Sequence, residues 1–327
     1  MVIGIVCEFD PLHRGHARLL SHARALGADT VVCAMSGSFT QRGSFAALSK
    51  TARAEMAVRC GADLVLELPT PWAMSPAETF ARGGVRLLAL AGADTLLFGS
   101  ECGDLPALRC LADCLDSPTF ADHLTAAPES GLTFAARRQA AAASLLDNAT
   151  AALLQSPNNT LAVEYCRAIL EQRAGMTPVP LPRRGANHGQ TLEESGHAQF
   201  ASASALRALW AEGGAEAVAP FVPEKAFELY KTAENDGMYT DFDAAGRCEL
   251  TLLRAACAKP EPFAAVRGVS EGLEHRLEHA VRQSTSLPQL LDALTTVRYP
   301  RARMRRLAMD AALGYTADTV PTLPPAL

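Results

Sequence analysis

The sequence has 327 residues, of which 49% are hydrophobic and 20% are charged, and its formal net charge is −5 at pH 7. This length allows a large hydrophobic core and predicts two domains, and the composition is typical of soluble globular proteins. The acidic balance argues against a protein that coats nucleic acid, and no apolar run approaches the roughly 20 residues of a membrane span. The N-terminus lacks the pattern of a secretion signal and the nine cysteines are scattered, so we expect a cytoplasmic protein.

Strand and helix patterns alternate regularly over the first hundred residues. Apolar runs predict buried strands at 2–7, 30–35, 63–68 and 94–98. Amphipathic segments predict helices at 15–26, 50–60 and 77–91. This alternation predicts an α/β fold with a doubly wound parallel sheet, in which ligands bind beyond the carboxyl ends of the strands.

The rest of the chain has a mainly helical pattern. One more strand is expected at 177–181, a helix begins near Ser202, and further helices run from about 215 to 314. We therefore expect an α/β domain over residues 1–212 and a helical domain over residues 213–327.

The most informative motif is His13-Arg14-Gly15-His16, which follows the first predicted strand and Pro11. A strand, a tight turn and a helix start place unpaired N–H groups and the positive end of the helix dipole at this point. Gly15 lets a base or ribose lie against the backbone. His13 and His16 can donate hydrogen bonds to phosphoryl oxygens while charge moves onto a departing pyrophosphate. The motif predicts a nucleoside triphosphate site, and the alternative is a helix cap with two incidental histidines.

Polar loops follow the other predicted strands. Residues 36–43 combine small hydroxyl residues with Gln41 and Arg42, and Gly99 ends the fourth strand. Because the carboxyl ends of parallel strands share one edge of the sheet, we expect these loops to converge on the first motif. An ordinary solvated loop is the alternative for residues 36–43. Asn158 and Asn159 begin a later helix, where one amide beyond the cap could face a ligand.

A second phosphate clamp is predicted where a helix begins near Ser202. Ser202 and Ser204 can cap this helix, and Arg207 lies one turn further in, after the pair Arg183 and Arg184. The alternative is a capped amphipathic helix with an exposed arginine. Near the C-terminus, a basic cluster predicts either RNA phosphate contacts or a solvated helix face. The cluster consists of Arg298, Arg301, Arg303, Arg305 and Arg306. We assign no metal site to the sequence, because His275 and His279 lack a third ligand.

The His-x-Gly-His motif resembles the signature of the nucleotidyltransferase superfamily, and the full set of motifs resembles the bacterial tRNA(Met) cytidine acetate ligase family. The matching segments are Gly4 to Val6, Glu8 to His16, Met35 to Gly37, Gln41 to Gly43, Gly61 to Pro69, Phe98 to Glu101, Pro157 to Asn159, and Ser202 to Ser204 with Arg207. The resemblance covers residues 1 to about 210 closely and the helical part to about 315 more thinly.

This resemblance implies a Rossmann-like nucleotidyltransferase fold and a reaction in two steps. Acetate attacks the α-phosphate of ATP to give acetyl-adenylate, and the acetyl group then passes to N4 of the wobble cytidine of elongator tRNA(Met). Mg²⁺ is expected to bridge the phosphates. His13, His16 and Arg207 are the implied catalytic residues. The implied ATP-binding residues are Val6, Cys7, Glu8, Phe9, Asp10, Pro11, Leu12, His13, Arg14, Gly15, His16, Ala17, Arg18, Leu19, Gly99, Asn159, one or both of Arg183 and Arg184, and Ser202 and Ser204.

Several positions depart from the family pattern. Family members usually have Asn at the position of Asp10, so a negative charge enters the nucleotide loop and predicts weaker ATP binding. They also usually have Asn at the position of Ser38 and Tyr-His-Asp where this chain has Asn187-His188-Gly189. Members of the family are longer than this chain.

Two alternative functions stay open at the level of the sequence. The chain could be a nucleotidyltransferase for a small phosphorylated metabolite, which would have little use for the arginine cluster. It could also be a nucleotide- or RNA-binding homologue with impaired catalysis, an alternative that Asp10 favours.

Overall fold

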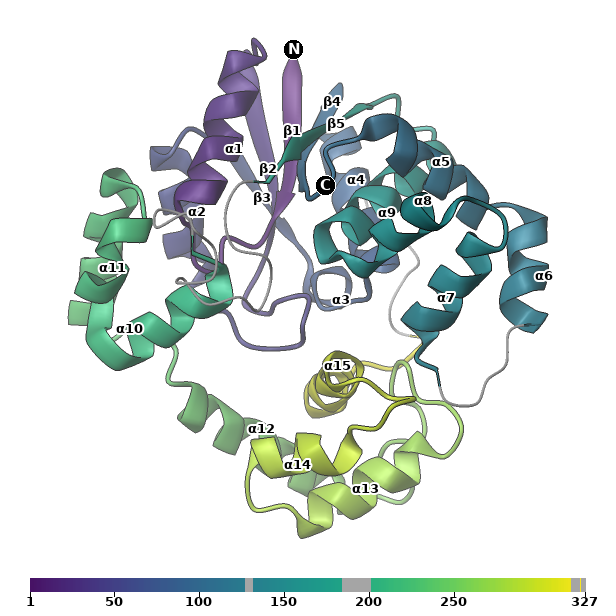
Figure 1. Cartoon of the computed structure of the whole chain (residues 1–327). Coiled ribbons are helices and arrows are strands. Elements are labelled where there is room, and N and C mark those ends of the chain that lie inside the picture. Colours follow the sequence, from purple (N-terminus) through teal and green to yellow (C-terminus); the bar gives the residue numbers. More distant parts are fainter. Residues whose placement is uncertain (127–131, 184–200, 319–323, 325–327) are drawn as a thin grey trace.

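A parallel sheet of five strands lies at the centre of the computed structural model, which describes residues 1–126, 132–183, 201–318 and 324 (Figure 1). The strand order is β3-β2-β1-β4-β5 and every neighbouring pair is parallel. The strands are β1 (Val2–Cys7), β2 (Thr30–Ser36), β3 (Leu64–Leu68), β4 (Thr95–Ser100) and β5 (Thr177–Pro182). The chain runs outward from β1 on one side and from β4 on the other, so the direction reverses between these two strands, where ligands bind in such sheets.

Helices cover both faces of the sheet because both faces are apolar. In β2, Val31 and Cys33 belong to one hydrophobic core while Val32 and Ala34 belong to the other, as the two-residue period of a strand requires. One core packs against α1 (Arg14–Ala25), α2 (Lys50–Arg59), α10 (Ala203–Val218) and α11 (Glu224–Asn235). The other packs against α4 (Ala77–Leu90), α5 (Leu105–Leu115), α7 (Phe134–Ala143) and α9 (Pro157–Glu171). The expected doubly wound α/β fold is confirmed.

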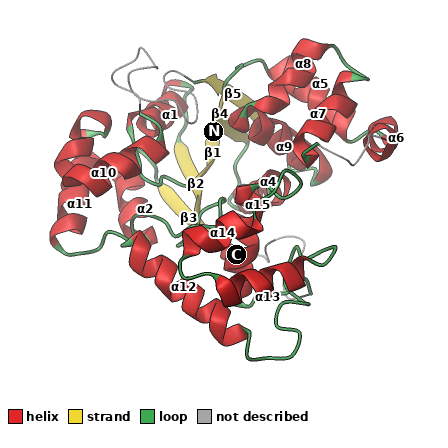
Figure 2. Cartoon of the chain, turned by 60° about the horizontal axis from the view of Figure 1, so that its bottom comes forward, coloured by secondary structure: helices red, strands yellow, loops and turns green. Residues whose placement is uncertain are grey.

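The C-terminal helices form a separate group with its own hydrophobic core. The group comprises α12 (Phe242–Ala256), α13 (Leu273–Gln283), α14 (Leu287–Leu294) and α15 (Arg301–Leu313). The strands run toward this group in Figure 1, and Figure 2 shows the group in front of the strands' carboxyl ends. The remaining helices are the short α3 (Thr70–Ala73), α6 (Pro118–Ala126) and α8 (Asn148–Ala152). Among the helices of the described residues, none combines the length and the apolar character that crossing a membrane requires.

The packing favours a later domain division than the expected one at residue 212. Leu206, Trp210, Val218 and Tyr230 of α10 and α11 belong to the core that covers the sheet. These two helices therefore extend the α/β unit, and the separate helical core begins with α12. The sequence pattern could not locate this division, because helices on a sheet and helices in a bundle share the same periodicity.

A buried arginine fixes the carboxyl ends of the two neighbouring strands β1 and β2. Arg53 of α2 is fully buried and donates to the carbonyl oxygens of Glu8 (2.6 Å), Ser36 (3.1 Å), Leu48 (3.1 Å) and Gly37. Buried carbonyl groups require donors, and a guanidinium can serve several of them at once. Arg53 thereby holds the ends of both strands and the start of the β2–α2 loop in one arrangement.

We expect the substitution Arg53→Met to destabilise the protein by about 3–5 kcal/mol, because it leaves buried carbonyl groups without donors. The free energy of unfolding, from urea denaturation, measures the effect. Arg59→Met on the exposed side of the same helix removes only a surface pair with Glu55 and serves as the control. Equal unfolding midpoints for the two variants would contradict the structural role of Arg53.

Candidate active site

A cavity of about 640 Å³ lies over the carboxyl edge of the sheet and has the size of a small-molecule site. Its walls come from the ends of β1 and β4, the loop after β2, the N-terminal parts of α1, α4, α9 and α10, and one side of α15. Among the residues that the structure describes, five arginines and two carboxylates line it, in a chain of net charge −5. The five are Arg18, Arg42, Arg183, Arg207 and Arg306. This concentration of positive charge favours an anionic ligand.

The N-terminus of α1 is built from both motif histidines. The Nδ1 atom of His13 accepts from the amide of Gly15 at 3.0 Å, and the Nδ1 atom of His16 accepts from the amide of His13 at 3.3 Å. The two rings stack with centroids 3.8 Å apart, and Phe9 packs edge-on against His16. A Cβ atom at position 15 would lie 2.8 Å from Cε1 of His13, so the motif needs glycine to make room for its own first imidazole.

These hydrogen bonds define how the histidines can act. Because both Nδ1 atoms accept from backbone amides, each neutral ring carries its proton on Nε2 and can donate that hydrogen to a ligand. Burial, together with the charge of Arg183, lowers the pKa of His13 to about 3. Burial, His13 and Arg183 also lower the pKa of His16 well below its usual range. Without a bound anion, both rings are therefore neutral hydrogen-bond donors at pH 7.

The N-terminus of α10 faces the same cavity. Ser202 caps this helix by accepting from the amide of Ala205 at 3.3 Å, and its hydroxyl lies 3.0 Å from that of Ser204. Arg207 donates to the backbone carbonyl of Asp10 and lies 3.2 Å from its carboxylate. The helix start, the two hydroxyls and the arginine form the arrangement expected of a second phosphate clamp.

Asp10 holds other parts of the site rather than presenting an unpaired charge. Its side chain is 4% exposed, accepts from the amide of Ala47 at 2.6 Å and pairs with Arg207. Ala47 in turn accepts from the amide of Thr240 at 2.9 Å, ahead of α12. The expected weakening of ATP binding by Asp10 stays a prediction, but its negative charge is offset by Arg207.

The loop after β2 is a fixed wall and not an ordinary solvated loop. Glu8 accepts from the amide of Gln41 at 2.6 Å, and burial raises the pKa of this carboxyl group. Gly43 has a φ of +79°, and a Cβ atom there would lie 2.8 Å from the backbone of Arg306 in α15. The C-terminal helices thus rest directly on a loop of the α/β domain.

Asn159 lies outside the cavity lining, and its side chain serves the packing of β4 against α9. Its Oδ1 accepts from the hydroxyl of Ser100 at 2.7 Å and from the amide of Cys102 at 3.1 Å, which joins β4 to α9. Glu101 accepts from the amides of Asn158 and Asn159 and caps α9. Asn158, and not Asn159, lines the cavity.

The structure brings most of the expected nucleotide residues together. Those that line the cavity are Val6, Cys7, Glu8, Phe9, Asp10, His13, Gly15, His16, Arg18, Leu19, Gly99, Arg183, Ser202, Ser204 and Arg207. Those outside its lining are Pro11, Leu12, Arg14, Ala17 and Asn159. Leu12 belongs to the core and Arg14 donates to the carbonyl of Val222. Arg184 lies outside the described residues.

The arginine cluster near the C-terminus divides into three environments. Arg298 and Arg303 lie 5.9 and 5.1 Å from the ring centroid of Tyr299, Arg298 pairs with Glu271 at 2.7 Å, and Arg301 pairs with Asp292 at the surface. Arg305 pairs at 2.6 Å with Glu249, which is buried. Arg306 lines the cavity. Within the first group, Arg298 and Arg301 are exposed and Arg303 is half-buried.

Sequence reasoning missed an apolar section of the cavity, which we call the aromatic section. It consists of Phe80, Phe98, Leu161 and Tyr165, from α4, β4 and α9. Phe98 and Tyr165 are neighbours, with ring centroids 5.5 Å apart. In the sequence these residues have the spacing of core positions, and only the three-dimensional arrangement shows that they also border a cavity.

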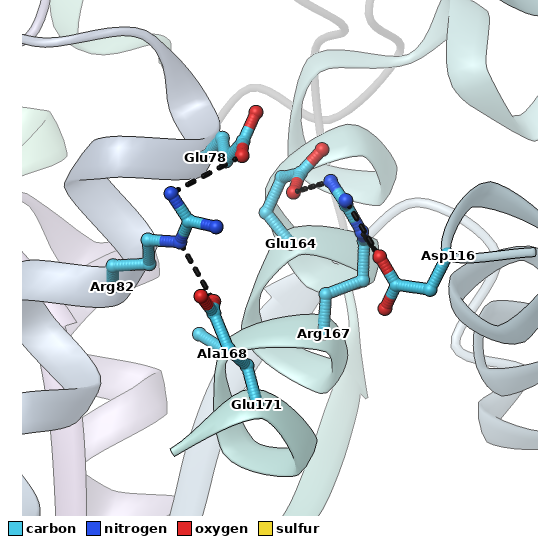
Figure 3. Close-up of a pocket in the computed structure, with 7 residues that line it drawn as sticks. All are labelled: Glu78, Arg82, Asp116, Glu164, Arg167, Ala168 and Glu171. Carbon is cyan, nitrogen blue, oxygen red and sulfur yellow. Dashed lines mark hydrogen bonds and ion pairs between the residues drawn. The ribbon is translucent and has the colours of Figure 1, made fainter. Parts of the chain in front are cut away.

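A second cavity, of about 330 Å³, lies between α4, α9 and the end of α5 (Figure 3). Its charged side chains pair with one another: Arg82 with Glu78 and Glu171, and Arg167 with Glu164 and Asp116. These ion pairs join α4 to α9 and α9 to the end of α5. We assign them a structural role.

Comparison with known proteins identifies similar chains. The family model described as HIGH Nucleotidyl Transferase matches residues 1–325. The tRNA(Met) cytidine acetate ligase of Syntrophotalea carbinolica is 36% identical over 325 residues, which cover 98% of this chain and 76% of that protein. The tRNA(Met) cytidine acetate ligase of Caldanaerobacter subterraneus subsp. tengcongensis is 35% identical over 320 residues, covering 95% and 77%.

Solved structures agree with these sequence matches. The crystal structure of Thermotoga maritima TmcAL bound with alpha-thio ATP matches with a TM-score of 0.87 at 31% sequence identity, covering 97% of this chain and 76% of that one. The apo form of the same protein matches with a TM-score of 0.89.

We expect the low histidine pKa values to make stability depend on pH. Between about pH 6.5 and pH 3, His13 binds a proton in the unfolded chain but not in the folded one, so stability falls as the pH falls through this window. The slope is about 1.4 kcal/mol per pH unit for each such imidazole. His13→Asn keeps a capping side chain and removes the titrating group. Urea denaturation between pH 4.5 and 6.5 should therefore give a flatter dependence for this variant, and an unchanged slope would contradict the assignment.

Proposed function

The chain belongs to the tRNA(Met) cytidine acetate ligase family of HIGH nucleotidyl transferases, and on that premise we propose that it activates acetate with ATP and transfers the acetyl group to a tRNA cytidine. The acceptor is N4 of the wobble cytidine of elongator tRNA(Met). One observation carries the catalytic part of this proposal: two neutral imidazoles, whose Nδ1 atoms accept from backbone amides, sit at a helix start inside a cationic cavity, at the reversal point of the sheet.

The first step is a displacement at phosphorus. An oxygen of acetate forms a bond to the α-phosphorus of ATP, the bond to the bridging oxygen breaks, and pyrophosphate leaves with that electron pair. Catalysis of such a step is mainly positioning and stabilisation of charge. His13 and His16 donate to the phosphoryl oxygens from α1, while Arg207 and the start of α10 hold the departing phosphates.

The carboxylates of the cavity do not suggest a metal cage supplied by the protein. Glu8 accepts from the amide of Gln41, and Asp10 is occupied by Ala47 and Arg207. Mg²⁺ bound with the ATP phosphates would supply positive charge that offsets the charge of the leaving group. His13, His16 and Arg207 would hold the phosphates themselves.

In the second step the N4 amine of cytidine attacks the acetyl carbon. AMP leaves with the electron pair of the acyl–phosphate bond, and the amine loses one proton. The position of α12 to α15 in front of the carboxyl ends of the strands (Figure 2), with Ala302 and Arg306 of α15 lining the cavity, supports a role for this group in holding the RNA. Arg298 and Arg301, which are exposed, and the half-buried Arg303 supply charge for the RNA phosphates.

We expect His16→Ala to reduce acetate-dependent ATP–pyrophosphate exchange by about 100- to 1000-fold, because a positioned donor to the developing charge is removed. Exchange of labelled pyrophosphate into ATP without tRNA measures this step. His22→Ala at the opposite end of the same helix should exchange normally. Undiminished exchange in the His16 variant would overturn the assigned mechanism.

Substitution of Arg298, Arg301 and Arg303 gives a second, independent test, which concerns the binding of tRNA. Replacing Arg298, Arg301 and Arg303 together with Ala should weaken tRNA binding and reduce its salt dependence by roughly 0.7 in slope for each phosphate that is no longer neutralised. Exchange without tRNA should not change, since these side chains lie outside the cavity lining. A control that removes the same charge elsewhere replaces the exposed Arg59, Arg109 and Arg173. Equal tRNA affinity and equal salt dependence in both triple variants would show that these arginines form a solvated surface and do not bind RNA.

A further inference from the structure

The cavity extends over both sides of the sheet's carboxyl edge. On one side lie the starts of α1 and α10, with His13, His16 and Arg207, where the proposed function places ATP. On the other side lies the aromatic section, which packs with the opposite core. The proposed function assigns the ATP phosphates to the first side and assigns no ligand to this second side. Walls of aromatic and apolar side chains suit a flat, uncharged ring.

Arg306 also lines the cavity, although it comes from the C-terminal helices, and α15 is held through Asp310 and Arg267 against the turn before α4. Ala302, one turn earlier in α15, lines the cavity as well. The guanidinium of Arg306 donates a long hydrogen bond of 3.4 Å to the carbonyl of Gln41. Within the described ranges no ion pair joins Arg306 to a carboxylate. Burial lowers its pKa to about 10, although the charge of Asp310 acts in the opposite direction. A partly buried cation in this state is stabilised by an incoming anion.

The position of Arg306 is fixed by contacts on both sides of it. Asp310, one turn later in α15, forms a two-pronged pair with Arg267 at 2.7 and 3.0 Å. Arg267 also donates to the carbonyl of Met74 (2.9 Å) and to the hydroxyl of Ser75 (3.1 Å), between α3 and α4. Together with the close approach at Gly43, these bonds hold α15 against the α/β domain.

Arg306 lies between the surface arginines and the cavity along α15. Arg303 precedes it by one turn of α15, and its charge is near enough to contribute to the low pKa of Arg306. Arg303 lies over Tyr299, whose other neighbour is Arg298. A strand of RNA that follows these charges from the surface would reach Arg306 at the cavity border.

We propose that Arg306 binds the phosphate of the acceptor nucleotide and that the aromatic section receives its base. This inference rests on the proposed function, since it divides one cavity between ATP and the cytidine. It makes Arg306 a substrate-binding residue of the transfer step, supplied by the C-terminal helices, and not part of the adenylating machinery. The base leaves its stack to enter the section, as in other enzymes that modify a nucleobase.

The test compares Arg306→Gln with Arg247→Gln, which removes the same charge from an exposed position of α12 in the same helical group. Adenylation is followed by acetate-dependent ATP–pyrophosphate exchange without tRNA, and transfer by single-turnover acetylation of saturating tRNA. We expect Arg306→Gln to exchange normally and to slow transfer by about 10- to 100-fold, the effect typical of removing one charged hydrogen bond. Arg247→Gln should exchange and transfer normally. Arg306→Lys should recover part of the transfer rate, because it restores the charge.

A second pair of variants tests the aromatic section. Leu161→Trp fills the section, whereas Leu170→Trp adds the same ring on an exposed face of the same helix, where Leu170 is 57% exposed. The first should block transfer while exchange continues, and the second should leave both transfer and exchange unchanged.

Three outcomes would overturn the inference. Loss of exchange in Arg306→Gln would place this arginine on the ATP or acetate side. Normal transfer in Arg306→Gln would show that Arg306 does not bind the acceptor nucleotide. Normal transfer in Leu161→Trp would show that the base does not enter the aromatic section. Absence of exchange and acetylation in the unsubstituted protein would instead refute the proposed function itself.

Discussion

The site depends on one buried cation that carries no catalytic task. Arg53 donates to carbonyl oxygens at the ends of β1 and β2 and in the loop that follows. Parallel strands have carbonyl groups without backbone donors at their carboxyl ends, and these ends form the base of the cavity. A side chain with five donors in a rigid plane satisfies several of them without bringing water into the core. The turn that carries the histidines and the loop that carries Arg42 therefore keep one relative position.

A second set of contacts joins the carboxyl ends of β1 and β2 to segments later in the sequence. Asp10 accepts from Ala47 and pairs with Arg207, so one carboxylate joins the first turn of the site to α10 almost 200 residues away. Its burial would be costly for an isolated charge and is compensated by these partners. The sequence predicts that this negative charge weakens ATP binding, which stays a prediction. In the structure the same residue organises the nucleotide loop.

The sequence predicted the fold well because its signals are local. Five strands and the helices between them follow from apolar periodicity, and the turns at Gly27, Gly61 and Gly92 have the positive φ angles expected of helix ends before a strand. The nucleotide motif could be found because His13, Gly15 and His16 interact within one helical turn. Arg53 could not be found, since an arginine inside an amphipathic helix has no pattern that distinguishes burial from exposure. The aromatic section was hidden for the same reason, as Phe80 and Tyr165 have core spacing.

The five arginines near the C-terminus show where reasoning from composition stops. A cluster of like charges within nine residues suggests a common role, yet the helix that carries most of them directs its side chains to different surroundings. Arg305 pairs with the buried Glu249, and Arg306 belongs to the cavity. The division follows from helical geometry, because consecutive residues on a helix differ by about 100° in direction. A helix that rests on an active-site loop through Gly43 must present one face to the substrates and another to its own core. The C-terminal helices are thereby part of the catalytic cavity as well as a surface beside it.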